Sequence, residues 1–189
     1  MTKESLRRLI RLRKQQLSLE ERERQSNEIM SLLEDTPVFQ KARVILLYAS
    51  LPDEVQTHAL LTRWHKQKRI LLPVVCGNEL ELREYKGEAS VQKGSFGILE
   101  PLESPPFTDF SSIDLAIIPG VAFTLDGKRL GRGRGYYDRL LAQRGFQSVY
   151  KIGVAYACQM LPELPISPYD IPLDEVITSD SVNFTIKKL

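Results

Sequence analysis

A short loop rich in glycine and arginine has the residue types in this 189-residue chain that are best suited to chemistry. Residues 131–138 read GRGRGYYD, so three glycines alternate with Arg132 and Arg134 before a predicted helix begins at Tyr136. Glycine lets the backbone approach a ligand and turn its N–H groups inward, and a helix N-terminus adds partial positive charge. Arginine donates two hydrogen bonds to a phosphate. The loop predicts a phosphate site, although it matches neither GxxxxGK[ST] nor GxGxxG, and a flexible basic surface loop is the plainer alternative.

Positive charge is concentrated in two short segments. Residues 1–14 hold six basic residues and one acid, residues 128–139 hold five and one, and the rest of the chain holds 15 basic and 22 acidic residues. This distribution favours a focused anion site over a broad nucleic-acid face, so we expect no nucleic-acid partner. Two alternatives stay open: a basic nucleic-acid-binding module, and a sugar-phosphate isomerase that binds phosphate without ATP.

Composition excludes several other classes. The chain is 42% hydrophobic and 26% charged, which is typical of a globular protein, and its length predicts one domain over residues 1–189. No stretch approaches the roughly 20 apolar residues of a membrane helix, and no apolar run opens the sequence, so we expect neither a membrane association nor a secretory signal. Cys76 and Cys158 form no CxxC pair, which fits the cytoplasm. His58 and His65 are the only histidines, which disfavours a His-rich zinc site or a Ser-His-Asp triad.

The elements that must position the loop follow from the apolar runs. A strand over Val44–Tyr48, a helix over Thr57–Lys68 and a strand over Ile70–Val75 predict one strand–helix–strand unit. Because these strands are apolar throughout, the sequence predicts an α/β fold whose mostly parallel sheet is covered by helices on both faces. The remaining expected elements are helices over 3–17, from Leu19 to near Pro37 and over 136–144, an edge strand over Glu79–Tyr85, strands over 115–118, 149–154, 176–178 and 182–186, and a loop over 86–112.

The N-terminal helix combines an apolar and a basic face. Lys3, Arg7 and Lys14 recur at spacings of four and seven, which predicts a cationic ridge, while Leu6 and Ile10 face inward. Two distant basic segments could then meet on one anion.

The run PGVAFTLDGKRLGRGRGYYDRLL at residues 119–141 resembles the signature of the 5-formyltetrahydrofolate cyclo-ligase family. Other segments follow in that family's order: the basic N-terminal helix, LPDEVQT at 51–57, FGILEP at 96–101 and DIPLD at 170–174. Thr124 stands where the family commonly has Asp, and Arg134 where Lys or Gly is common; Thr124 can still cap a turn and Arg134 keeps the charge. The resemblance implies a three-layer α/β/α fold with a mostly parallel, Rossmann-like central sheet and an added edge strand or hairpin.

The same resemblance implies a reaction and its partners. ATP would drive closure of 5-formyltetrahydrofolate to 5,10-methenyltetrahydrofolate, with Mg²⁺ as cofactor and with release of ADP and phosphate. Transfer of the γ-phosphoryl group makes the formyl oxygen a leaving group, and N10 of the folate then closes the ring. Such a transfer needs positioning and charge neutralisation more than a protein nucleophile. The partners would be 5-formyltetrahydrofolate and ATP, and we expect a cytoplasmic monomer.

Site residues are carried over from the matching positions. The resemblance assigns catalysis to Arg134 and Tyr136. It assigns ATP binding to Lys3, Arg7, Arg129, Gly131, Arg132, Gly133, Arg134, Gly135, Tyr136 and Tyr137. It assigns substrate binding to Ala49, Glu54, Phe96 and Tyr136, and metal binding to Asp138 and Asp170. Plainer alternatives are helix-end acids for Glu54 and Asp138 and a core aromatic for Phe96. A carboxylate beside a triphosphate is repulsive without an intervening cation, which favours Asp138 as a magnesium ligand.

Overall fold

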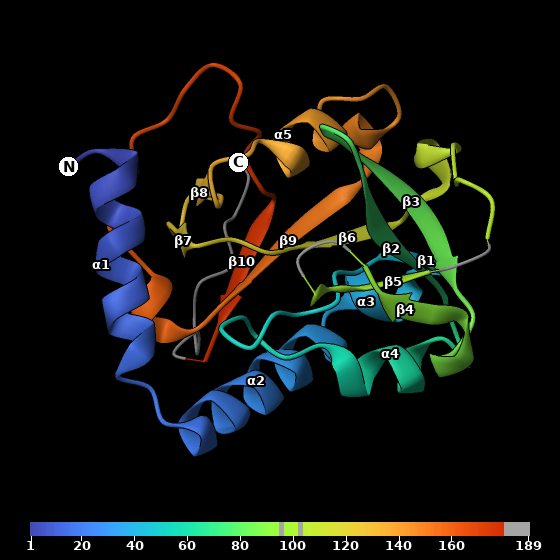
Figure 1. The fold of residues 1–189 in the computed structure, drawn as a ribbon, viewed down its shortest axis with the longest axis horizontal. Coiled ribbons are helices and arrows are strands. Elements are labelled where there is room, and N and C mark those ends of the chain that lie inside the picture. Colours follow the sequence, from blue (N-terminus) through green and yellow to red (C-terminus); the bar gives the residue numbers. More distant parts are fainter. Residues whose placement is uncertain (95–96, 102–103, 180–189) are drawn as a thin grey trace.

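A six-stranded sheet forms the centre of the computed structural model, which describes residues 1–94, 97–101 and 104–179 (Figure 1). The strand order is β10-β9-β6-β1-β2-β3. The bounds are β1 (Val44–Leu46), β2 (Arg69–Cys76), β3 (Glu79–Tyr85), β6 (Leu115–Ile118), β9 (Tyr150–Ala155) and β10 (Glu175–Thr178). All neighbours are parallel except β2 and β3, which pair antiparallel, so β3 is the added edge strand. The predicted α/β fold is confirmed.

Helices and turns form the two outer layers. The helices α2 (Leu19–Glu34), α3 (Pro37–Lys41) and α4 (His58–Trp64) pack on one face of the sheet, and α5 (Tyr136–Leu141) packs on the other (Figure 1). The helix α1 (Lys3–Gln15) lies at one end, against the small hairpin of β7 (Ala122–Phe123) and β8 (Arg129–Leu130). No helix in the described ranges is long and apolar enough to cross a membrane.

The apolar character of the strands follows from this layering. Ile45 of β1 belongs to the apolar cluster of α2, α3 and α4, whereas the next residue, Leu46, belongs to the cluster of α5. Both are fully buried. Since successive side chains point to opposite faces, a strand covered on both sides has no position for a polar alternation.

Local signals explain most helix starts. Thr2 accepts a hydrogen bond from the N–H of Ser5 at the start of α1, and Ser18 accepts one from the N–H of Glu21 at the start of α2. The Glu21 side chain accepts from Arg24 and Gln25, so the cap at Ser18 lacks the reciprocal bond of a capping box.

Several sequence-based expectations were wrong in detail. Residues 86–112 are not only loop, because β4 (Val91–Lys93) and β5 (Leu99–Pro101) form a hairpin there. The helix expected over 136–144 is α5, and it ends at Leu141 rather than at Arg144. Gly145 then turns the chain in a left-handed conformation with φ of 102°. The strand expected over 182–186 lies outside the described residues.

Candidate active site

The site lies where the strand order changes direction. From β1 the sheet runs one way through β2 and the other way through β6 and β9. Open α/β sheets bind ligands beyond the carboxyl ends of their strands at such a point. A cavity of about 520 Å³ is found there, lined by Ala49 and Glu54 from the segment after β1 and by Pro119 and Gly120 from the segment after β6.

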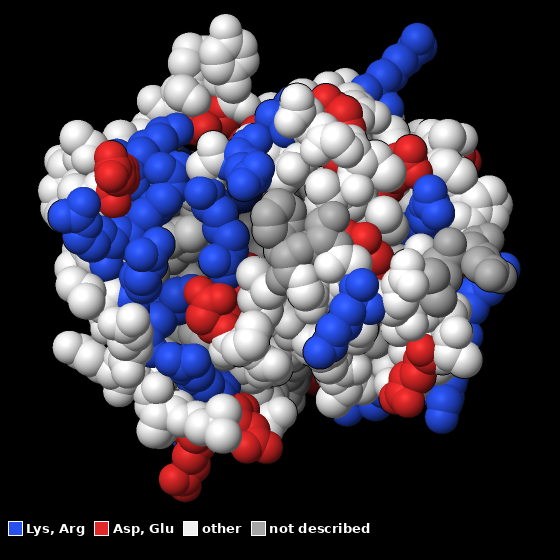
Figure 2. Space-filling model, in the orientation of Figure 1, with Lys and Arg blue, Asp and Glu red and all other residues white. Residues whose placement is uncertain are grey.

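Two walls of different chemistry enclose the cavity. We call Lys3, Arg7, Arg129, Arg132 and Arg134 the cationic wall; these residues come from α1, β8 and the glycine loop. We call Pro73, Val75, Leu80 and Ile98 the apolar wall; they come from β2, β3 and the approach to β5. Figure 2 shows basic side chains gathered around a hollow on the side of the molecule that carries α1. The cavity therefore suits a ligand, or two ligands, with one polyanionic part and one flat apolar part.

The glycine loop has the backbone that the sequence predicts. Gly133 and Gly135 adopt φ of 106° and 69°, a region that favours glycine, and Gly135 is the N-cap residue of α5. Arg7 Nε donates to the carbonyl oxygen of Gly131 at 2.8 Å, and a Cβ on Gly133 would lie 3.4 Å from the Arg7 guanidinium. Helix α1 thus lies directly against the loop, and the two basic segments meet as expected.

Glu54 is a buried carboxylate paired with Arg132 of the glycine loop. Arg132 donates to Glu54 Oε1 from Nε at 3.1 Å and from Nη2 at 2.9 Å. The N–H of Leu51 donates to Oε2 at 3.0 Å, and the hydroxyl of Tyr156 donates to the backbone oxygen of Glu54 at 2.8 Å. These contacts fix both the backbone and the side chain of Glu54 next to the glycine loop, where Glu54 lines the cavity.

Three tyrosines border the cavity in different ways. Burial, with the charge of Glu54, raises the pKa of Tyr137 and of Tyr48 well above the ordinary value, so both hydroxyls stay protonated. Tyr48 donates to the carbonyl oxygen of Val55 at 2.8 Å. Tyr136 donates to the carbonyl oxygen of Gly77 at 3.1 Å, which ties α5 to the turn between β2 and β3. A cavity-facing role for Tyr136 would accordingly use its ring.

Each carboxylate expected to hold a metal has a cationic partner. Asp138 Oδ1 accepts from Arg129 Nη2 at 2.6 Å, and the Arg129 side chain is only 3% exposed. Asp170 forms an ion pair with Lys3; burial raises the pKa of Asp170, but the hydrogen bonds from Lys3 and Ser167 outweigh this and lower it. No group of three or more acidic, histidine or cysteine ligands occurs in the described ranges. Since Mg²⁺ binds one or two carboxylates together with waters and substrate phosphates, this donor set fits a metal delivered with a nucleotide.

Nearly all the residues expected from the sequence line this one cavity. They are Lys3, Arg7, Ala49, Glu54, Arg129, Gly131, Arg132, Gly133, Arg134, Gly135, Tyr136, Tyr137, Asp138 and Asp170. Phe96 lies outside the described residues. The individual roles of these side chains stay predictions.

Sequence reasoning missed the apolar wall and Glu100, which also lines the cavity. One usable signal was the alternation of Leu80 and Leu82 with charged residues, which marks a strand with one covered face. Lys14 was also misplaced: it is 5% exposed, lies in the stripe of Leu6 and Ile10 and forms an ion pair with Asp53, so it does not belong to an exposed ridge.

Comparison with known proteins agrees with this geometry. Residues 1–179 match the model of the 5-formyltetrahydrofolate cyclo-ligase family. The 5-formyltetrahydrofolate cyclo-ligase of Escherichia coli K12 is 31% identical over 180 residues, covering 92% of this chain and 98% of that protein. The enzyme of Mus musculus is 31% identical over 191 residues, covering 95% and 94%. The solution structure of 5,10-methenyltetrahydrofolate synthetase from Aquifex aeolicus superimposes with a TM-score of 0.86 at 38% identity, covering 100% of this chain and 95% of that one.

Proposed function

Because the chain belongs to the 5-formyltetrahydrofolate cyclo-ligase family, we propose that this cavity closes the ring of 5-formyltetrahydrofolate with the help of ATP and Mg²⁺. The chain is an enzyme of that family, and its reaction is the formation of 5,10-methenyltetrahydrofolate. The use of ATP and Mg²⁺ by this chain, and the roles of its individual residues, are our proposal.

The observation that carries the proposal is the pairing of the two walls in one cavity. The cationic wall and the N–H groups of the glycine loop suit a triphosphate, and the apolar wall suits the bicyclic ring of a reduced folate. Both substrates must meet for a phosphoryl group to pass between them, so a shared cavity is a requirement of the chemistry.

In the first step, the formyl oxygen of the folate attacks the γ-phosphorus of ATP, and the bond from that phosphorus to the bridging oxygen breaks to release ADP. Arg134 and Arg132 neutralise the charge on the transferring group, and Lys3 and Arg7 hold the remaining phosphates. The loop glycines allow the backbone to come close enough to donate as well. The phosphorylated oxygen is then a good leaving group.

In the second step, N10 of the folate attacks the formyl carbon, loses its proton, and phosphate departs with the original oxygen. Glu54 accepts hydrogen bonds from the folate beside Ala49, and the ring of Tyr136 packs against both substrates. Burial and the charge of Glu54 keep the Tyr137 hydroxyl protonated, so it is available as a neutral hydrogen-bond donor.

Asp138 and Asp170 are the residues that would hold Mg²⁺. When bound with the nucleotide, the ion neutralises phosphate charge. Lys3 and Arg129, which now pair with these carboxylates, are themselves members of the cationic wall. An exchange of partners between carboxylates, cations and phosphates is therefore compatible with the geometry.

The test is a mixture of the protein, Mg-ATP and 5-formyltetrahydrofolate, followed by the absorbance of the methenyl product. We expect product and ADP in equal amounts, with neither formed when ATP or Mg²⁺ is omitted. The matched control is Arg11→Ala, which removes an arginine of α1 that does not line the cavity and should leave turnover unchanged. Folded wild-type protein that forms no methenyl product would contradict the function.

We further propose that one domain spans residues 1–189 and acts as a cytoplasmic monomer without nucleic acid. In support, one chain supplies both walls, and on the face drawn in Figure 2 basic side chains gather around a hollow. Gel filtration with light scattering tests the monomer.

A further inference from the structure

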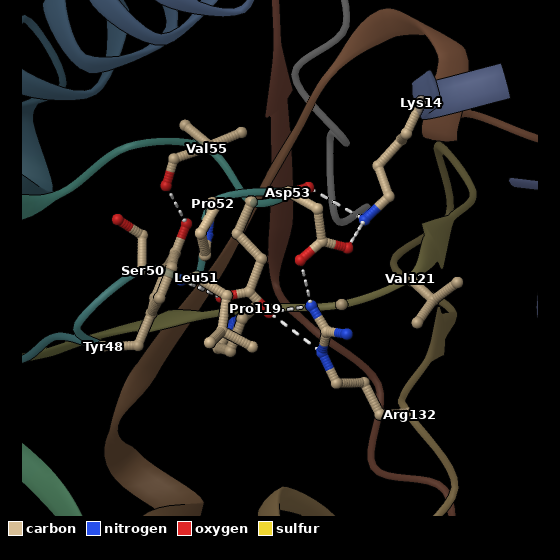
Figure 3. Close-up of polar contacts among 12 residues, drawn as sticks. Lys14, Tyr48, Ser50, Leu51, Pro52, Asp53, Val55, Pro119, Val121 and Arg132 are labelled. Atoms are coloured by element: carbon tan, nitrogen blue, oxygen red, sulfur yellow. Dashed lines mark hydrogen bonds and ion pairs between the residues drawn. The ribbon is translucent and has the colours of Figure 1, made fainter. Parts of the chain in front are cut away.

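Asp53 does not line the cavity, yet its carboxylate joins two parts of the cavity wall (Figure 3). Lys14, in the last turn of α1, forms an ion pair with Oδ2, and Arg132 Nη2 donates to Oδ1 at 2.8 Å. Lys14 Nζ also donates to the backbone oxygen of Asp53 at 2.8 Å. Asp53 therefore bridges the N-terminal helix and the glycine loop.

These contacts complete a closed circuit. At the other end of α1, Arg7 donates to Gly131, the residue directly before Arg132. Arg132 is shared, because its Nη2 reaches both Asp53 and Glu54. Helix α1, which carries Lys3 and Arg7, is thus tied to Arg132 and Glu54 through two separate routes.

The circuit is more than a loose surface ion pair. The side chain of Lys14 is only 6% exposed, and an ammonium in such a place needs its carboxylate. Arg22 of α2 donates to the backbone oxygen of Lys14 at 2.6 Å and to that of Pro52 at 3.3 Å, so the helix end and the loop are held together. Burial raises the pKa of Asp53, but the hydrogen bonds from Lys14 and Arg132 outweigh that effect and lower it, which keeps the bridge charged at neutral pH.

We infer that Asp53 is a positioning residue that couples the nucleotide side of the cavity to the folate side. It fixes the position of α1 relative to Arg132, and the position of Arg132 relative to Glu54. This inference rests on the proposed function. Loss of the bridge should lower the affinity of the protein for both substrates. Because coupling between two sites is reciprocal, it should also reduce the effect that each bound substrate has on the affinity for the other.

The main variant is Asp53→Asn, which keeps the shape of the side chain and removes its charge. We expect the KM values for Mg-ATP and for 5-formyltetrahydrofolate each to rise about tenfold. The matched control is Asp126→Asn: Asp126 also accepts from a lysine and a hydroxyl, Lys128 and Thr124, but lies outside the cavity lining. Both KM values should stay at the wild-type level in that control.

Binding without turnover gives a second readout. The affinity for 5-formyltetrahydrofolate is measured with and without a saturating non-hydrolysable Mg-ATP analogue. We expect the ratio of the two affinities to differ from one in the wild type and to approach one in Asp53→Asn. A ratio of one in the wild type, or equal ratios in both proteins, would overturn the coupling.

Lys14→Gln approaches the same bridge from α1 and guards against misfolding of a single variant. If Asp53 acts through Lys14, the double variant should be no worse than Asp53→Asn alone. Lower melting temperatures with unchanged KM values, or a rise in only one KM, would show a purely structural or one-sided role and overturn the inference. Failure of the proposed function would instead appear as an inactive wild type.

Discussion

The two walls of the cavity are built by opposite means. The apolar wall stands on regular structure: Val75 and Leu80 face each other across the antiparallel pair of β2 and β3, and their backbone positions are fixed by the sheet. The cationic wall comes from segments far apart in sequence and is held by side-chain contacts, among them Arg129 with Asp138 and Arg132 with Glu54. The apolar surface is thus built by the sheet itself, whereas under the proposed function the paired charges would exchange partners when phosphate binds.

We expect the largest effect from a variant that removes a negative charge paired with the cationic wall. Asp138→Asn leaves the buried guanidinium of Arg129 without a charged partner, so we expect a loss of about 3 kcal/mol in the free energy of unfolding, measured with urea. The Mg²⁺ concentration needed for half-maximal turnover should also rise, because one carboxylate of the expected metal site is lost. Asp126→Asn, at an exposed ion pair, should change the stability by about 0.5 kcal/mol at most. Equal stabilities for the two variants would mean that the wall does not depend on this pair.

Arg134→Ala and Arg132→Ala test whether an arginine of the glycine loop acts on ATP alone or on both substrates. Loss of a charge-assisted phosphate contact should cost about 1.5–3 kcal/mol in Mg-ATP binding for either variant, measured by calorimetry. Arg132→Ala should also weaken folate binding, since Arg132 holds the Glu54 carboxylate with two hydrogen bonds. Unchanged ATP affinity in both variants would exclude the glycine loop as the phosphate site.

Lys3→Ala and Arg7→Ala test whether α1 belongs to the nucleotide site. Each should raise the KM for ATP about tenfold, equivalent to about 1.4 kcal/mol, with little change in the KM for folate. Arg11→Ala removes the same type of charge from the same helix, one turn after Arg7, and should behave as wild type. Wild-type kinetics for Lys3→Ala and Arg7→Ala would reduce α1 to a structural cover.

The apolar wall should respond in the opposite way. Ile98→Val removes one methylene from the cavity lining, so we expect the KM for 5-formyltetrahydrofolate to rise about fourfold, or about 0.8 kcal/mol, and the KM for ATP to stay unchanged. Ile166→Val, at a side chain 64% exposed, is the control. An effect on ATP alone would reverse our assignment of the walls.

The smallest effect concerns pH. The pKa values of Asp53 and Asp170 are lowered from 3.8, so these carboxylates stabilise the fold above about pH 4, and that stabilisation is lost as the pH falls through their folded-state values. Both carboxylates are themselves partly exposed, which screens their charge even where the cation is buried, so we expect about 0.5 kcal/mol each. In urea unfolding between pH 2 and pH 6, the double variant Asp53→Asn/Asp170→Asn should show a flatter acid limb. Ile98→Val should run parallel to wild type at every pH.

The same contrast explains what the sequence could predict. Local spacing and the family resemblance were enough to select the glycine loop, Lys3 and Arg7 as candidate site residues. The place of Ile98 in the apolar wall does not follow from local spacing, because β5 next to it has only three residues, in a segment rich in Gly, Pro and Ser, and its pairing with β4 is a tertiary event. The strands that carry Val75 and Leu80 were predicted, but the polarity along a strand does not show which of its residues line a cavity.

Partners of buried charges were equally hidden. The spacing of Leu6, Ile10 and Lys14 by four residues places Lys14 on the apolar stripe of its helix, so its burial could have been predicted. That Asp53 would meet it depends on how the loop after β1 folds back, which no local pattern encodes. Helix ends were similarly imprecise, since α5 stops three residues early at a turn that Gly145 completes.

The antiparallel edge strand β3 also bears on how copies of this protein behave when crowded together. An uncovered edge offers unpaired N–H and C=O groups on which a strand of another molecule can add, the first event in ordered aggregation. Here the N–H of Phe107 donates to the carbonyl oxygen of Leu82 in the middle of β3 at 2.7 Å, and the strand carries charged residues at Glu81, Arg83 and Glu84. The chain thus blocks this edge with its own backbone, and fibril growth by strand addition at β3 would first have to displace it.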